Sequence, residues 1–124
     1  MKTILARAPA YQTRDGSEIR ELMHPDVHGA THAVASQSLA EATVAPGQRT
    51  APHRHLRSEE LYHITAGIGR MTLGERYFEV AAGDTVCIPP ATMHCIENIG
   101  ATPLRLLCMC APAYSHTDTH LLGG

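Results

Sequence analysis

The segment HRHLRSEELYH, residues 53–63, gathers side chains that can bind a metal ion or move protons. His53 and His55 stand two positions apart, and two adjacent carboxylates, Glu59 and Glu60, follow them. Residues two apart in a β-strand lie on one face, so the two imidazoles would project together. Neutral imidazole is a common ligand of transition metals. Taken alone, the segment is also compatible with a solvent-exposed polar loop.

A third imidazole comes from a distant part of the chain. The segment GDTVCIPPATMHCIEN, residues 83–98, carries His94 after a proline-rich corner. Adjacent residues of a strand face opposite ways, so only one of Glu59 and Glu60 can join the histidines. Three histidines and one carboxylate from separate segments favour a metal site over an exposed loop.

Short apolar segments separated by turn residues fill the chain from residue 37 onward, and no stretch shows the apolar spacing of a long helix. This regular alternation of strands and turns predicts an all-β sandwich or barrel. The expected strands are 38–44, 49–55, 59–66, the hairpin 69–80, 85–90, 94–99 and 104–110.

Composition excludes several classes of function. The 124 residues suffice for one globular domain, with 44% hydrophobic and 18% charged residues. A net charge of −2, one Phe and no Trp give no support for a nucleic-acid partner. No apolar run approaches the roughly 18 residues of a membrane helix, and the N-terminus lacks the apolar region of a signal peptide. We therefore expect a cytoplasmic protein without a membrane partner.

The four cysteines, Cys87, Cys95, Cys108 and Cys110, lie in apolar stretches and form no C-x-x-C pair. A zinc ribbon or a thioredoxin-like site is not indicated. We expect these residues to be small buried hydrophobes.

Both histidine segments resemble the two sequence motifs of the cupin family. The first motif is Gly, five residues, His-x-His, three or four residues, Glu, six residues and Gly. The matching positions are Gly47, His53, His55, Glu60 and Gly67. This spacing selects Glu60 rather than Glu59.

The second cupin motif is Gly, five residues, Pro-x-Gly, two residues, His, three residues and Asn. The matching positions are Gly83, Pro89, His94 and Asn98, with Ala91 in place of the motif's second Gly. That departure affects the backbone of the corner and leaves every ligand position intact.

The resemblance implies a small cupin β-barrel, also called a double-stranded β-helix or jelly roll. It also implies one divalent transition metal (Fe, Mn, Ni, Zn, Cu or Co) that is held by His53, His55, Glu60 and His94. Four protein ligands would leave one or two positions for a small-molecule substrate.

The domain limits follow from the extent of the resemblance. We expect an N-terminal extension over residues 1–36, the cupin barrel over 37–112 and a surface tail over 113–124. Small cupins commonly pair as homodimers, and the segment EIREL, residues 18–22, is a candidate for strand exchange. EIREL also fits a helical face, so its local structure stays open.

Strand alternation predicts which side chains face the metal. If Glu60 and His94 point inward, the other inward positions form a mostly apolar wall that favours a small carbonyl, enol or aromatic acid over a sugar phosphate. Those far from the metal fit a role in the core equally well. The predicted pocket residues are Tyr62, Ile64, Ile96, Asn98, Leu106 and Cys108.

The remaining histidines have no clear place in the site. His63 should face outward, and His24, His28 and His32 lie in an expected loop. Tyr114, His116 and His120 could fold over the mouth of the barrel, but we expect them in an exposed tail.

Three functions remain open, and no catalytic residue is assigned. The first is an Fe(II) dioxygenase-like enzyme for an enolisable or aromatic compound. The second is a non-redox metal-dependent isomerase, epimerase, decarboxylase or lyase for a sugar or small acid. The third is a non-catalytic binding or sensing module. One fold hosts many chemistries, so the resemblance does not decide between them.

Overall fold

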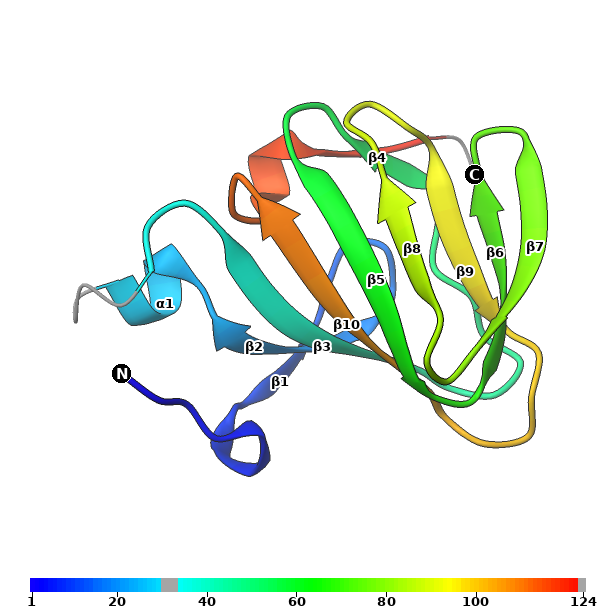
Figure 1. The fold of residues 1–124 in the computed structure, drawn as a ribbon, viewed down its shortest axis with the longest axis horizontal. Coiled ribbons are helices and arrows are strands. Elements are labelled where there is room, and N and C mark those ends of the chain that lie inside the picture. The colour runs from blue at the N-terminus through cyan, green and yellow to red at the C-terminus, as the bar shows by residue number, and fades with distance from the viewer. Residues whose placement is uncertain (30–33, 123–124) are drawn as a thin grey trace.

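The computed structural model describes residues 1–29 and 34–122, and its regular secondary structure is almost entirely β-strand, arranged in two antiparallel sheets (Figure 1). The predicted all-β fold is confirmed. His32, which we expected in a loop, lies outside the described residues.

The first sheet has the strand order β1-β2-β3-β10-β5-β8, and the second has the order β11-β4-β9-β6-β7. The first sheet consists of β1 (Ala10–Gln12), β2 (Glu18–Met23), β3 (Ser38–Val44), β10 (Leu104–Ala111), β5 (Glu59–Ala66) and β8 (Thr85–Ile88). The second consists of β11 (Thr119–Leu121), β4 (His53–His55), β9 (His94–Asn98), β6 (Ile68–Leu73) and β7 (Arg76–Ala81). In the described part of the chain, the helical turns are η1 (Leu5–Arg7), α1 (Pro25–His28) and η3 (His116–Asp118). Among the described residues, none of these helices has the length and hydropathy to cross a membrane.

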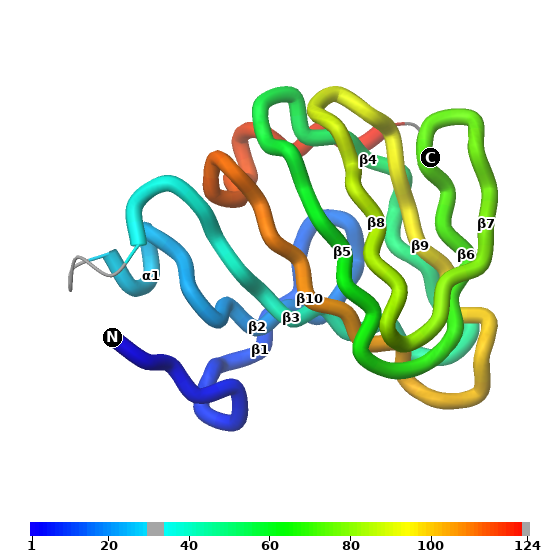
Figure 2. The backbone as a smooth tube through the Cα atoms, in the orientation of Figure 1, coloured from blue at the N-terminus to red at the C-terminus, as the bar shows by residue number. Residues whose placement is uncertain are grey.

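The chain passes back and forth between the sheets, as the backbone tube shows (Figure 2). Alternation along the strands directs apolar side chains into the shared interior. In β10, Leu104 and Leu106 are buried while Arg105 between them is exposed. In β5, Tyr62 and Ile64 are buried while His63 is exposed. Side chains from both sheets therefore form one hydrophobic core.

The N-terminal extension is part of the first sheet. EIREL forms β2, which pairs with β1 and with β3 of the same chain. The turn between β1 and β2 contains Gly16, whose φ of +96° suits glycine. Strand exchange and a homodimer remain predictions.

The C-terminal segment also joins a sheet. β11 pairs with β4, and its first residue, Thr119, is buried although His120 and Leu121 are exposed. The expected surface tail therefore reaches the strand that carries His53 and His55.

One expectation about the cysteines is wrong. Cys95 and Cys110 are buried and Cys108 is partly buried, but Cys87 is exposed. β8 is an edge strand of the first sheet, and alternation turns Cys87 outward while Val86 and Ile88 face the core.

The corner before β9 has the backbone that the motif's glycine would favour. Ala91 has a φ of +64°, in the left-handed region, and its amide donates a hydrogen bond to His55 O at 2.6 Å. The corner is thus tied to the strand of the first two histidines despite the strain of an alanine there.

We predict that Ala91→Gly stabilises the protein. Glycine relieves the left-handed strain of the folded state, and this gain should exceed the free-energy cost of the more flexible unfolded chain. The free energy of unfolding should therefore rise by about 0.5 to 1 kcal/mol. Urea denaturation measures the change. The control is Ala82→Gly at an exposed turn position without a positive φ, which should lower stability. Equal destabilisation by both variants would contradict the prediction.

Candidate metal centre

Three imidazoles meet between neighbouring strands of the second sheet. His53 and His55 come from β4 and His94 from β9, with His53 and His94 paired in register. All three are buried, at 2%, 4% and 0% exposure. Each can offer a ligand atom within 4.8 Å of the other two, so the group could hold a metal ion.

Hydrogen bonds fix the tautomers of His53 and His94. His53 Nδ1 lies 2.7 Å from Ala51 O, and His94 Nδ1 lies 3.0 Å from Thr92 O. A carbonyl oxygen only accepts, so each Nδ1 must carry the proton. The lone pair of each neutral ring is therefore on Nε2, which faces the centre of the group.

The tail fixes the third tautomer. His55 Nδ1 lies 3.0 Å from the hydroxyl of Thr119, and that hydroxyl donates to Ser115 O at 2.9 Å. Because the single hydroxyl proton is used, Thr119 accepts the proton of His55 Nδ1. His55 Nε2 is then also a free electron-pair donor.

A carboxylate from the first sheet completes the group. Glu60 Oε1 lies 3.3 Å from His55 Nε2 and 3.2 Å from His94 Nε2. The second oxygen, Oε2, accepts a hydrogen bond from Cys110 Sγ at 3.3 Å. Glu60 is 4% exposed, whereas Glu59 faces solvent, as alternation predicts.

The four donors fit a metal ion on physical grounds. Glu60 Oε1 and His94 Nε2 are buried and have no hydrogen-bond partner. Two lone pairs that face each other at 3.2 Å repel, and a cation between them removes the repulsion. Ligands about 2.1 Å from one ion are separated by roughly 3.0–3.4 Å, which matches the two contacts of Glu60 with His55 and His94.

The protonation states suit this role. Burial lowers the pKa of His53, and the neighbouring His94 adds to the effect, so the imidazole is neutral at neutral pH. Burial alone would raise the pKa of Glu60, but hydrogen bonds and positive charge from protonated His55 and His94 lower it to about 2, and a metal cation in place of those protons would act in the same direction. Neutral imidazole and ionised carboxylate are the forms that bind metals.

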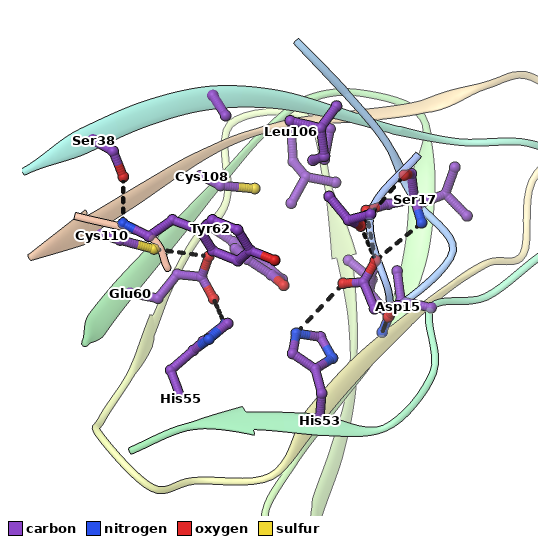
Figure 3. Close-up of a pocket in the computed structure, with 18 of the residues that line it drawn as sticks. Asp15, Ser17, Ser38, His53, His55, Glu60, Tyr62, Leu106, Cys108 and Cys110 are labelled. Carbon is purple, nitrogen blue, oxygen red and sulfur yellow. Dashed lines mark hydrogen bonds and ion pairs between the residues drawn. The ribbon is translucent and has the colours of Figure 1, made fainter. Parts of the chain in front are cut away.

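Asp15 is a site residue that sequence reasoning missed. It lies in the turn between β1 and β2, and its Oδ2 is 3.4 Å from His53 Nε2 (Figure 3). The Asp-Gly pair at positions 15 and 16 signals a turn. Nothing local indicates that this turn packs against β4.

A partly open pocket with a free volume of about 40 Å³ adjoins the histidines and Glu60. Four of the six predicted pocket residues line it: Tyr62, Ile96, Leu106 and Cys108. The other two do not. Ile64 is fully buried in the core, and the Asn98 amide donates to Val44 O and Thr102 O.

The N-terminal extension supplies lining that we had not expected. It contributes Tyr11, Thr13, Asp15, Ser17, Ile19 and Glu21. The pocket therefore has a largely polar wall from the extension as well as the apolar wall from the barrel strands.

The other histidines lie outside the group. His63 is exposed and bonds to Thr85, and His120 is exposed on β11. His24 caps α1, in the segment that we expected to be a loop, and its Nε2 donates to Tyr114 O at 2.7 Å. His28 Nδ1 accepts from His24 N.

Tyr114 differs from its expected exposed position. Its ring lies 5.7 Å from that of His55, it lines the pocket, and its hydroxyl bonds to His116.

Comparisons with known proteins agree with the fold and the site. The profile of the family described as Cupin domain matches residues 40–110, so the chain belongs to the cupin family. The uncharacterized protein MJ1618 of Methanocaldococcus jannaschii is 50% identical over 98% of this chain and 94% of its own length. Protein SchB of Streptomyces halstedii is 31% identical over 85% of this chain and 73% of its own.

Solved structures show the same fold. A Bacillus subtilis oxalate decarboxylase, described for its Mn(II) centres, has a TM-score of 0.79 and 25% identity. The match covers 95% of this chain but only 31% of that one. The protein is thus a metal-binding cupin whose histidine group could hold the ion.

We predict that Glu60→Gln weakens metal binding and that Glu59→Gln does not. The first change removes the buried charge beside His55 and His94, so affinity should fall by more than the roughly 10–100-fold typical of outer-shell changes. Titration with Zn(II) measures both variants. A larger loss in Glu59→Gln would show that the register is shifted by one residue.

Thr119→Val tests the contribution of the tail. The variant keeps the shape of the side chain but removes the acceptor for His55 Nδ1, so metal affinity should fall roughly 10–100-fold. Thr117→Val, at an exposed position of η3, is the matched control. Unchanged affinity in Thr119→Val would mean that His55 keeps its orientation without this bond.

Proposed function

We propose that this cupin is a metal-dependent enzyme for non-redox chemistry on a small organic carbonyl compound, such as isomerisation, epimerisation, decarboxylation or C–O lyase chemistry. The observation that carries the proposal is a second, fixed carboxylate beside the histidines. In Figure 3, Glu60 lies beside His55 while Asp15 lies beside His53.

Asp15 is held in one orientation. Its Oδ1 accepts hydrogen bonds from Thr13 Oγ1 at 2.6 Å, Ser17 N at 3.0 Å and Ser17 Oγ at 2.8 Å. Its backbone carbonyl accepts from Ala51 N at 2.7 Å. With Oδ1 saturated, Oδ2 is the oxygen available to the pocket.

The chain's own groups divide the work. A divalent metal held by the three histidines and Glu60 would polarise a carbonyl oxygen. Asp15 Oδ2 is then placed to accept a proton from the carbon beside that carbonyl and to return it to another atom of the substrate. The side chains of Tyr62, Ile96 and Leu106 keep water from the reacting atoms.

Other titratable groups of the pocket remain protonated. Burial raises the pKa of Tyr62 and of Cys108 well above their usual values, and the charge of Glu60 adds to both effects. The phenol and the thiol are therefore hydrogen-bond donors rather than bases. Two lining carboxylates remain besides Glu60, and we assign the role of proton acceptor to Asp15, because it contacts His53 whereas Glu21 is bonded to Tyr11.

Fe(II) dioxygenase-like chemistry is the second candidate. The apolar wall of Tyr62, Ile96, Leu106 and Cys108 favours it, because such a wall would protect a reactive complex from water. Metal dependence separates the two candidates.

The experiment follows proton exchange and oxygen uptake in parallel. The protein is stripped of metal and reloaded with Zn(II), Mn(II), Co(II) or Fe(II), with and without oxygen. Small charged and uncharged carbonyl compounds are then incubated with it in D₂O, and exchange at the carbon beside the carbonyl is read by NMR.

We expect exchange with Zn(II) as well as Fe(II), independent of oxygen. It should fall at least about 100-fold in Asp15→Asn, within the range for loss of a general base. Glu79→Gln, which removes a charge from an exposed position of β7, should leave it unchanged. Turnover only with Fe(II) and oxygen would support the oxygenase instead. Ligand-dependent stabilisation without turnover would indicate a binding module.

A further inference from the structure

We propose that the pocket selects uncharged hydroxycarbonyl compounds over anionic ones, and that Asp15 is the residue that sets this preference. This inference rests on the proposed function, because it concerns the ligand that would occupy the same pocket. It names the class of substrate and narrows the proposed chemistry to isomerisation, epimerisation or C–O lyase reactions, because a decarboxylase needs a carboxylate in its substrate.

The charge of the lining is the first support. Three carboxylates line the pocket, Asp15, Glu21 and Glu60, and within the described residues no Lys or Arg lines it. A 2+ ion with neutral histidines would leave a net charge of −1. An anionic ligand would add a second negative charge at a site of low polarity, where charge repulsion is strong.

The neighbouring arginines do not offset this charge. Arg14 precedes Asp15 in the turn, but it is exposed and donates to His116 O at 3.3 Å. Arg54 lies between His53 and His55 on β4, and alternation directs it to the opposite face of the strand. Neither contributes to the pocket lining.

The hydrogen-bonding capacity is the second support. Glu21 Oε1 accepts from the hydroxyl of Tyr11 at 2.5 Å, while Glu21 Oε2 is buried without a hydrogen-bond partner. Among the described residues, Asp15 Oδ2 has one polar contact, with His53 Nε2, and that nitrogen carries a lone pair and donates no proton. The polar wall therefore offers acceptors and calls for a ligand that donates, as a hydroxyl group does.

Asp15 is the carboxylate placed to discriminate. Its Oδ2 lies 3.4 Å from His53 Nε2, whereas the hydrogen bond of Glu21 is with Tyr11. It can accept a bond from a ligand hydroxyl, and it repels a ligand carboxylate in the same position.

The test compares two probes of similar size and shape. Hydroxyacetone and pyruvate each place two oxygens on adjacent carbons, but the first is uncharged with a hydroxyl donor and the second is an anion. Co(II)-loaded protein is titrated with each, and the visible spectrum of Co(II) reports the dissociation constant. The readout does not require turnover.

We expect wild-type protein to bind hydroxyacetone more tightly than pyruvate. Asp15→Asn should shift the ratio of the two dissociation constants toward pyruvate by at least about tenfold, as expected for loss of one nearby charge in a poorly solvated site. Asparagine keeps Oδ1 as the acceptor for Thr13 and Ser17, and Co(II) content and thermal unfolding verify that the turn is intact. Glu21→Gln, which leaves the turn untouched, should shift the ratio in the same direction by a smaller factor.

Glu79→Gln is the control for net charge and should leave the ratio unchanged. Tighter binding of pyruvate by wild-type protein, an unchanged ratio in Asp15→Asn, or no spectral response to either probe would each overturn the inference. Proton exchange on charged substrates in the earlier experiment would overturn it while leaving the proposed enzyme intact. If the protein binds Co(II) and prefers hydroxyacetone but catalyses no proton exchange, only the proposed enzymatic activity is refuted.

Discussion

The structure of the site depends on one constraint: the unprotonated nitrogen and oxygen atoms of three histidines and one glutamate face one another in a buried space. His53, His55 and His94 each donate Nδ1–H outward, to Ala51 O, to Thr119 and to Thr92 O respectively. Their Nε2 atoms and Glu60 Oε1 are left facing one another without protons between them. Such an arrangement is costly in a protein interior unless a cation occupies it, so the fold is prepared for a metal ion.

The terminal segments maintain this arrangement as much as the barrel does. The peptide unit of Ala51 has a double role, because its carbonyl orients His53 and its amide holds the backbone of Asp15 at 2.7 Å. On the other side, β11 carries the hydroxyl that orients His55. The extension and the tail are therefore structural parts of the centre, and we expect changes in either to reach the metal.

The strand period explains which parts of the site the sequence could predict. Alternation and motif spacing placed Glu60 inside and Glu59 outside, and they assigned Tyr62, Ile96, Leu106 and Cys108 to the pocket. Ile64 and Asn98 have the right parity but lie beyond the lining, because parity gives the face of a strand and not the position along the barrel. Asp15 and Thr119 could not be predicted, since each acts through a contact with a strand distant in sequence. Thr119, for example, meets His55 across 64 positions.

X-ray absorption spectroscopy of the Zn(II)-loaded protein tests the central claim most directly. Three imidazoles and one carboxylate predict nitrogen and oxygen neighbours at about 2.0–2.2 Å, with the multiple-scattering pattern of three imidazole rings. Cys108 lines the pocket and Cys110 bonds to Glu60, so a thiolate is the nearest competing ligand. A sulfur neighbour at about 2.3 Å, or a pattern from fewer than three imidazoles, would contradict the account.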